Sequence, residues 1–179
     1  MYLLVQETCP RVDDIRFIPL TRGLFAKVSA RHYVHLMRWR WCAQWNPHTR
    51  SFYATRKTTA AEGRNKTTVV MSRVILGLDS GDKRQAEHKN HDTLDNTDNN
   101  LRIATTSQNQ GNRRKPRTNT TGFKGVSECW RRGRFLGYMA QIIFQGKWTY
   151  LGLHLTPQLA HEAYCAKALE LHGEFARAG

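Results

Sequence analysis

A polar, basic run at residues 110–121 (QGNRRKPRTNTT) limits the possible folds of this chain more than any other feature. The run is almost free of apolar side chains, so it cannot bury a core, and the apolar positions on either side must form separate units. We therefore predict an N-terminal domain over residues 1–112, a basic linker over residues 113–119 and a C-terminal domain over residues 120–179. A chain of 179 residues has room for two such small domains.

The formal net charge of +14 favours a polyanionic partner. Residues 1–60 and 111–179 hold the excess of Lys and Arg, whereas residues 61–110 carry equal numbers of acidic and basic side chains. Two basic flanks around a neutral centre suit a protein that grips DNA beside a site whose carboxylates bind a cation. The charge alone leaves open a basic protein that binds RNA or the ribosome.

The cysteines give no sign of a metal site, because Cys9, Cys42, Cys129 and Cys165 include no C-x-x-C pair. They could form two disulfides, but nothing else indicates secretion, and we expect reduced thiols in a cytoplasmic protein. No apolar run approaches the roughly 18 residues of a membrane span, and the first residues lack the basic start of a signal peptide. We expect a monomer without a membrane or protein partner.

The predicted fold class is α+β, with short strands and few helices in each part. In the N-terminal part, strands are expected near residues 18–28, 52–54 and 67–71, and the apolar spacing of residues 29–41 predicts a short helix. Trp39, Trp41 and Trp45 lie among arginines, as in some DNA contacts, but we favour a small core.

The C-terminal part predicts three antiparallel strands followed by one helix. The strands are expected at residues 123–130, 138–144 and 148–153, with a tight turn at Gln145-Gly146. Thr156 as N-cap and Pro157 at the first helical position start the helix, and Gly173 ends it.

A group of polar residues near the centre is the candidate active site. A short strand ends at Glu87-His88, an Asn- and Asp-rich turn follows, and Asn100 opens the return strand at residues 101–103. A short helix capped by Thr106 or Ser107 then carries Asn109. Such a hairpin and helix would place all four residues on one face. Carboxylate and amide oxygens suit Mg²⁺, and histidine can take a proton from water near neutral pH.

This pattern, E-H followed by N-N-L-R and S-Q-N, resembles the HNH nucleases with a ββα-metal fold, in particular homing endonucleases of phage and intron type. The family residues that the chain keeps are His88, Asn90, Leu94, Asp95, Asn96, Asn100, Leu101 and Arg102. The segments LTRG (20–23), 41–43 and 71–77 also match the usual upstream part.

The resemblance implies a role for each residue of the group. His88 would be the general base and Asn100 would orient it. Glu87 and Asn109 would bind one Mg²⁺ or Mn²⁺ ion, and Arg102 would contact either the hairpin or a phosphate.

The chain departs from the family at three positions, with Glu87 in place of Asp, Ser72 where His is frequent, and His91 where Gly is frequent. Two other interpretations compete with a nuclease site. His88-x-x-His91 could be half of a zinc site, and the Asn and Asp residues could form only a turn, which they favour in any protein.

The C-terminal part resembles the DNA-binding domain of plant ethylene-response factors over about residues 120–178, through F-K-G-V (123–126), A-Q-I (140–142), Y-L-G (150–152) and the helix near 160–164. The resemblance implies a sheet lying in the DNA major groove. The family's arginines are absent at Ser127 and Cys129. The candidate DNA contacts of the sheet are Lys124, Trp130, Arg132, Arg134, Gln141, Lys147 and Tyr150, and those of the linker are Arg113, Arg114, Lys115 and Arg117. Ordinary solvent-exposed residues, and a linker that is only a tether, are the alternatives.

Together the patterns predict a metal-dependent HNH endonuclease that hydrolyses phosphodiester bonds in double-stranded DNA. The alternative is a sequence-specific DNA-binding protein whose nuclease site has become inactive.

Overall fold

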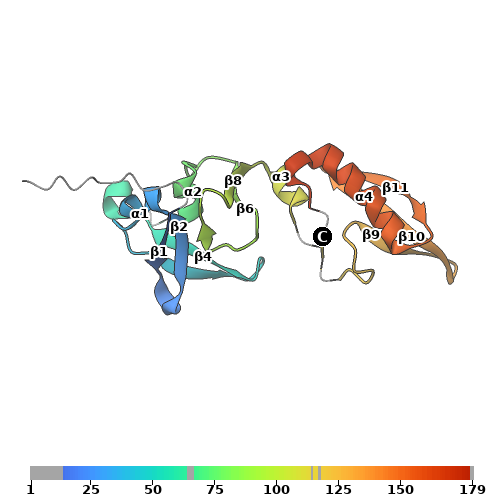
Figure 1. Cartoon of the computed structure of the whole chain (residues 1–179), viewed down its shortest axis with the longest axis horizontal. Coiled ribbons are helices and arrows are strands. Elements are labelled where there is room, and N and C mark those ends of the chain that lie inside the picture. The colour runs from blue at the N-terminus through green and yellow to red at the C-terminus, as the bar shows by residue number, and fades with distance from the viewer. Residues whose placement is uncertain (1–13, 64–66, 114, 117, 178–179) are drawn as a thin grey trace, which may run out of the picture. The chain divides into compact units, whose positions relative to one another are not determined.

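The structure is a computed structural model that describes residues 14–63, 67–113, 115–116 and 118–177. It combines helices with several small sheets, so the predicted α+β class is confirmed (Figure 1). The chain forms two compact units, residues 1–103 and 104–179. The division falls before the predicted boundary at residue 112. Helix α3 (Thr106–Gly111), which is predicted to close the N-terminal domain, therefore belongs to the second unit.

The described residues of the first unit form three small sheets. The first has the order β1-β2-β7, in which β1 and β2 are antiparallel and β7 lies parallel to β2. The second is the antiparallel sheet β3-β4-β5, and the third pairs β6 with β8. The strands are β1 (Ile15–Pro19), β2 (Phe25–Ser29), β3 (Cys42–Asn46), β4 (Ser51–Lys57), β5 (Thr68–Val70), β6 (Gln85–His88), β7 (Asp95–Asn96) and β8 (Leu101–Ala104). The helices are α1 (Ala30–Leu36), α2 (Met71–Ile75) and the short 3₁₀ turns Thr21–Gly23 and Ala60–Glu62.

One apolar core holds the first two sheets and both helices together. Its fully buried side chains include Ile18, Val28, Leu36 and Met71. Trp41 belongs to this core, and its indole N–H donates to the carbonyl of Leu36 at 2.8 Å.

The predicted core role of the tryptophans is confirmed for Trp41 and for Trp39, which packs against the same cluster, whereas Trp45 lies outside it and is 46% exposed. The guanidinium of Arg56 lies 4.5 Å from the ring centre of Trp39 and forms two hydrogen bonds with Glu62. The arginine next to these rings is therefore part of the packing.

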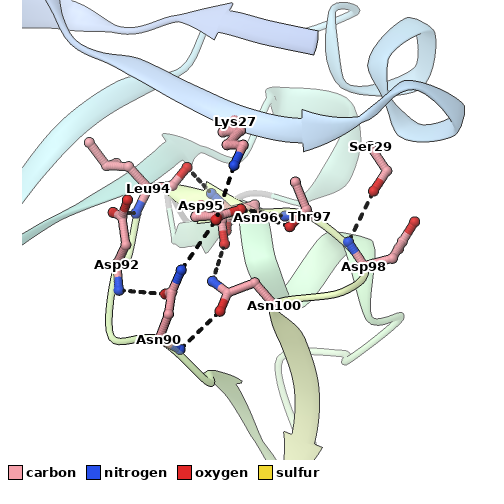
Figure 2. A network of polar contacts seen from close by, with 10 residues as sticks. All are labelled: Lys27, Ser29, Asn90, Asp92, Leu94, Asp95, Asn96, Thr97, Asp98 and Asn100. Carbon is pink, nitrogen blue, oxygen red and sulfur yellow. Dashed lines mark hydrogen bonds and ion pairs between the residues drawn. The ribbon is translucent and has the colours of Figure 1, made fainter. Parts of the chain in front are cut away.

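The turn between β6 and β8 is fastened to strand β2. Lys27 pairs with Asp95 in the parallel register, and the Lys27 N–H donates to the Leu94 carbonyl at 2.8 Å. In Figure 2 the side chains of Lys27 and Asn90 both point to Asp95, and the Asp98 N–H meets the Ser29 hydroxyl. The N-terminal sheet thus fixes the loop that carries the candidate site.

The second unit contains the predicted three-stranded antiparallel sheet and its helix. Its strands β9 (Val126–Arg131), β10 (Arg134–Phe144) and β11 (Lys147–His154) have the order β11-β10-β9, with α4 (Pro157–His172) packed on one face (Figure 1). The buried contacts are made by Val126, Ala140, Ile142, Ala160, Tyr164 and Ala168. The Thr156 hydroxyl accepts from the Leu159 N–H, and Gly173 ends the helix with φ 53°, so the predicted cap signals are confirmed. A 3₁₀ turn, Gly173–Phe175, follows.

Helix α3 and part of the predicted linker are bonded into the second unit. The Lys124 ammonium donates to the Gly111 carbonyl at 2.7 Å, at the end of α3. The Lys115 ammonium donates to the Gly122 carbonyl, and the Asn119 amide donates to the carbonyls of Phe123 and Val126. The described residues Lys115 and Asn119 of the predicted basic linker thus pair with backbone carbonyls of the second unit.

Among the described residues, no helix is long and apolar enough to cross a membrane.

Candidate active site in the hairpin of strands β6 and β8

Strand β6 ends at the predicted Glu87-His88 pair, and both side chains are buried. Strand β8, which pairs with β6, carries Arg102. The sequence alternates so that Leu101 is buried on one face of β8 while Arg102 is directed to the Glu87 carboxylate. This short two-stranded sheet brings together three of the predicted residues.

The two oxygens of the Glu87 carboxylate have different surroundings. Oε2 accepts a hydrogen bond from the Arg102 Nε–H at 2.5 Å, with side-chain exposures of 2% for Glu87 and 15% for Arg102. Oε1 is buried and has no hydrogen-bond partner among the described residues. A buried carboxylate oxygen without a donor is costly, and it is the kind of ligand that Mg²⁺ or Mn²⁺ prefers. The residue therefore fits the predicted cation.

Arg102 takes part in the same ion pair. Of the two roles left open by the sequence, a hairpin contact and a phosphate contact, the hairpin contact is the one seen in the structure.

The ring of His88 is held by an amide, but the amide is that of Asn96. Asn96 Oδ1 lies 3.2 Å from His88 Nε2, and Asn96 Nδ2 donates to the Leu94 carbonyl. The oxygen of Asn96 therefore accepts from an Nε2–H, which leaves Nδ1 of the neutral ring as the proton acceptor. Burial lowers the pKa of His88, more than the bond to Asn96 and the charges of Asp92 and Asp95 raise it. Burial thus favours the neutral form of the ring, and the bond to Asn96 fixes its orientation.

Asn100 has a different role from the predicted orientation of His88. Its Oδ1 accepts from the Asn90 N–H at 3.0 Å, and its Nδ2 donates to the Asp95 carbonyl at 2.6 Å (Figure 2). Both ends of the buried amide are used to close the turn. The prediction for Asn100 is therefore corrected: it shapes the loop, and Asn96 is the residue that contacts the base.

We expect Asn100→Ala to destabilise the first unit by about 2 kcal/mol, because two hydrogen bonds are lost in a buried turn. Chemical denaturation followed by tryptophan fluorescence measures the change. Asn99→Ala is the matched control, since Asn99 is its exposed neighbour. Equal stability of the two variants would contradict the role given to Asn100.

Asn109 lies half-buried on α3, which belongs to the second unit. Its grouping with Glu87 around one cation therefore stays a prediction. His91 adopts a left-handed conformation, with φ 62°, in the turn position where the HNH nucleases that the sequence resembles often have Gly. The described residues include no group of three or more His, Cys, Asp or Glu side chains placed to hold a metal ion.

In the second unit most of the predicted DNA contacts lie at the surface. The exposed ones are Arg113, Lys115, Trp130, Arg132, Arg134, Lys147 and Tyr150, and Gln141 is half-buried. Arg114 and Arg117 lie outside the described residues.

Lys124 is the exception, because it is buried. It is only 7% exposed, and its ammonium donates to the carbonyls of Gly111 and Arg177. The prediction that Lys124 contacts DNA is therefore wrong. The lysine ties α3 and Arg177 to the sheet, since its long side chain can reach buried carbonyls.

Burial lowers the pKa of Lys124 to about 8, with a further lowering by Arg177. The unfolded chain then binds more protons than the folded one between about pH 8 and the ordinary lysine value of 10.5. The stability of the second unit should therefore rise with pH over this window, and Lys124→Met should remove the rise. Denaturation midpoints at pH 8 and pH 10 measure it; a fall in the wild type, or an unchanged slope in the variant, would contradict this.

Sequence reasoning missed Trp148, which is exposed on β11. Its indole N–H donates to Gln141 Oε1 at 2.7 Å, and its ring stacks on Tyr150 with centroids 6.3 Å apart. The signal was present, because residues two apart on a strand share a face. Trp148, Tyr150 and Gln141 thus form one surface, turned away from the helix-facing side chain of Ile142.

No protein-family profile matches this chain, and neither a curated protein nor a solved structure was found to match it.

Proposed function

We propose that this protein is a metal-dependent DNA endonuclease of the HNH type with a ββα-metal site, whose residues Glu87 and His88 lie on the hairpin β6-β8. The observation that supports it most is the buried Glu87 oxygen without a hydrogen-bond donor among the described residues, followed in the sequence by a histidine ring that Asn96 orients. A carboxylate ligand for a cation and a proton acceptor are two of the groups needed to hydrolyse a phosphodiester.

In the proposed reaction His88 accepts the proton of the attacking water at Nδ1, while Asn96 holds the ring through Nε2. Glu87 and, as predicted, Asn109 would hold one Mg²⁺ or Mn²⁺ ion. Such an ion neutralises charge on the phosphate and on the leaving 3′ oxygen. Asn100 keeps the turn closed, so that the Asn96 amide stays within hydrogen-bond distance of the His88 ring.

The second unit is proposed to hold double-stranded DNA through its sheet and the basic residues before it. Exposed Arg132, Arg134 and Lys147 supply positive charge at the two hairpin ends. The surface of Trp148, Tyr150 and Gln141 offers aromatic and amide contacts to base edges. Two modules on one duplex raise the effective concentration of each, so weak contacts can suffice.

Substitution of Glu87 tests the proposed site. Glu87→Gln keeps the shape of the side chain but removes its charge, so Mg²⁺-dependent nicking of supercoiled plasmid should fall to background. Glu87→Asp restores the residue usual in the family and should still nick. Persistent nicking by Glu87→Gln, at wild-type rate, would exclude this carboxylate from the mechanism.

A second candidate function is DNA binding without cleavage. It is favoured by the ion pair with Arg102, which already neutralises Glu87, and by the burial of His88. DNA binding by a chain that never nicks, in Mg²⁺ or in Mn²⁺, would select this candidate.

A further inference from the structure

The ion pair between Arg102 and Glu87 sets a condition on cation binding. The pair is nearly dry, with exposures of 15% and 2%, and the Nε–Oε2 distance is 2.5 Å. The second oxygen, Oε1, is buried and unpartnered among the described residues. One oxygen of the Glu87 carboxylate is therefore paired with a fixed positive charge. The other oxygen has no hydrogen-bond donor among the described residues.

A divalent ion at Oε1 would share this carboxylate with the guanidinium. Like charges beside one carboxylate repel, and the repulsion is larger in a buried site than in water. The guanidinium also cannot lose its proton, since arginine stays charged in proteins. Arg102 should therefore weaken cation binding while its guanidinium stays beside the Glu87 carboxylate.

A phosphate would change this balance. Guanidinium groups form strong charge-assisted hydrogen bonds with phosphate oxygens, and the side chain of Arg102 is not sealed from solvent. A phosphodiester beside Arg102 would offset its charge or draw it from Oε2. Either change leaves more of the Glu87 charge for the cation.

We propose that Arg102 makes cation binding at Glu87 depend on a DNA phosphate. The proposal rests on the proposed function and adds a positioning residue to it. Because coupling between two ligands is reciprocal, the cation must also tighten the binding of DNA at this site. The free protein then holds its cation weakly, and the site is completed on the duplex.

The test is titration of the full chain with Mn²⁺ in the absence of DNA, with free Mn²⁺ followed by electron paramagnetic resonance. Arg102→Gln should tighten binding by about tenfold, the scale of one unit charge near a divalent ion in water. Arg84→Gln is the matched control, because it breaks an exposed pair with Asp82 and should change nothing. Arg102→Lys keeps the charge and should bind as weakly as the wild type.

Glu87→Gln distinguishes a failure of the coupling between cation and phosphate from a failure of the cation site itself. If its loss of charge abolishes Mn²⁺ binding but Arg102→Gln binds no tighter than the wild type, the coupling is refuted and the cation site stands. If Glu87→Gln binds Mn²⁺ as the wild type does, the cation site is refuted as well.

A second measurement does not depend on the folding of the Arg102 variants. His88→Ala, which should cleave far more slowly than the wild type, is titrated with Mn²⁺ with and without a duplex oligonucleotide. The variant His88→Ala with Glu87→Gln gives the background of ions held by the DNA. Tighter binding on the duplex, above that background, is expected, and equal binding would overturn the coupling.

Discussion

His88→Ala should lower the rate of Mg²⁺-dependent nicking by about a hundredfold to ten-thousandfold, the range lost with a general base. The remaining site still has Glu87 and Arg102, so affinity for duplex DNA should stay near that of the wild type. Nicking of supercoiled plasmid gives the rate, and fluorescence anisotropy with a labelled duplex gives the affinity.

His48→Ala serves as the control for His88→Ala, because His48 is an exposed histidine of the same unit. It should nick at the wild-type rate. Unchanged nicking by His88→Ala would remove this ring from the mechanism. A parallel loss of DNA binding and cleavage would place His88 in binding and not in proton transfer.

Gly125→Ala should have the largest effect on stability, because Gly125 touches the core of the second unit. A Cβ at this position would lie 2.0 Å from a ring carbon of Tyr164, a buried residue of helix α4. Gly125 also has φ +75°, a conformation that side chains rarely adopt. Overpacking and backbone strain together should cost about 3 kcal/mol or more. Denaturation of the full chain, followed by far-ultraviolet circular dichroism, measures the loss.

Gly146→Ala separates the two causes. Gly146 has nearly the same backbone conformation, φ +78°, but a Cβ there would meet nothing within 4 Å. The control should therefore cost only the backbone term, about 1 kcal/mol. Equal losses in the two variants would show that contact with Tyr164 is unimportant.

The elements with local signals were predictable from the sequence. The sheet and helix of the second unit follow from the Gln145-Gly146 turn, the Thr156-Pro157 start and the apolar positions between them. The Glu87-His88 strand end and the return strand at Leu101 are also local, since alternation and turn residues define them.

The failures concern contacts between residues far apart in the sequence. Nothing local indicates that Lys124 reaches back to the Gly111 carbonyl, which fixes α3 to the second unit and buries a predicted DNA contact. Asn96 and Asn100 carry the same amide side chain, so the sequence cannot tell which of them contacts His88. The conformation of the loop decides it, because Asn96 contacts His88 and Asn100 contacts the Asp95 carbonyl. The ion pair of Glu87 with Arg102 likewise depends on the pairing of β6 with β8.

Nicking of supercoiled plasmid by the full chain, with Mg²⁺ and with EDTA, tests the central claim most directly. The unpartnered oxygen of Glu87 and the oriented ring of His88 predict open-circular product with Mg²⁺ and none with EDTA. Plasmid that stays supercoiled with Mg²⁺ and with Mn²⁺, or that is nicked equally in EDTA, would contradict a metal-dependent nuclease.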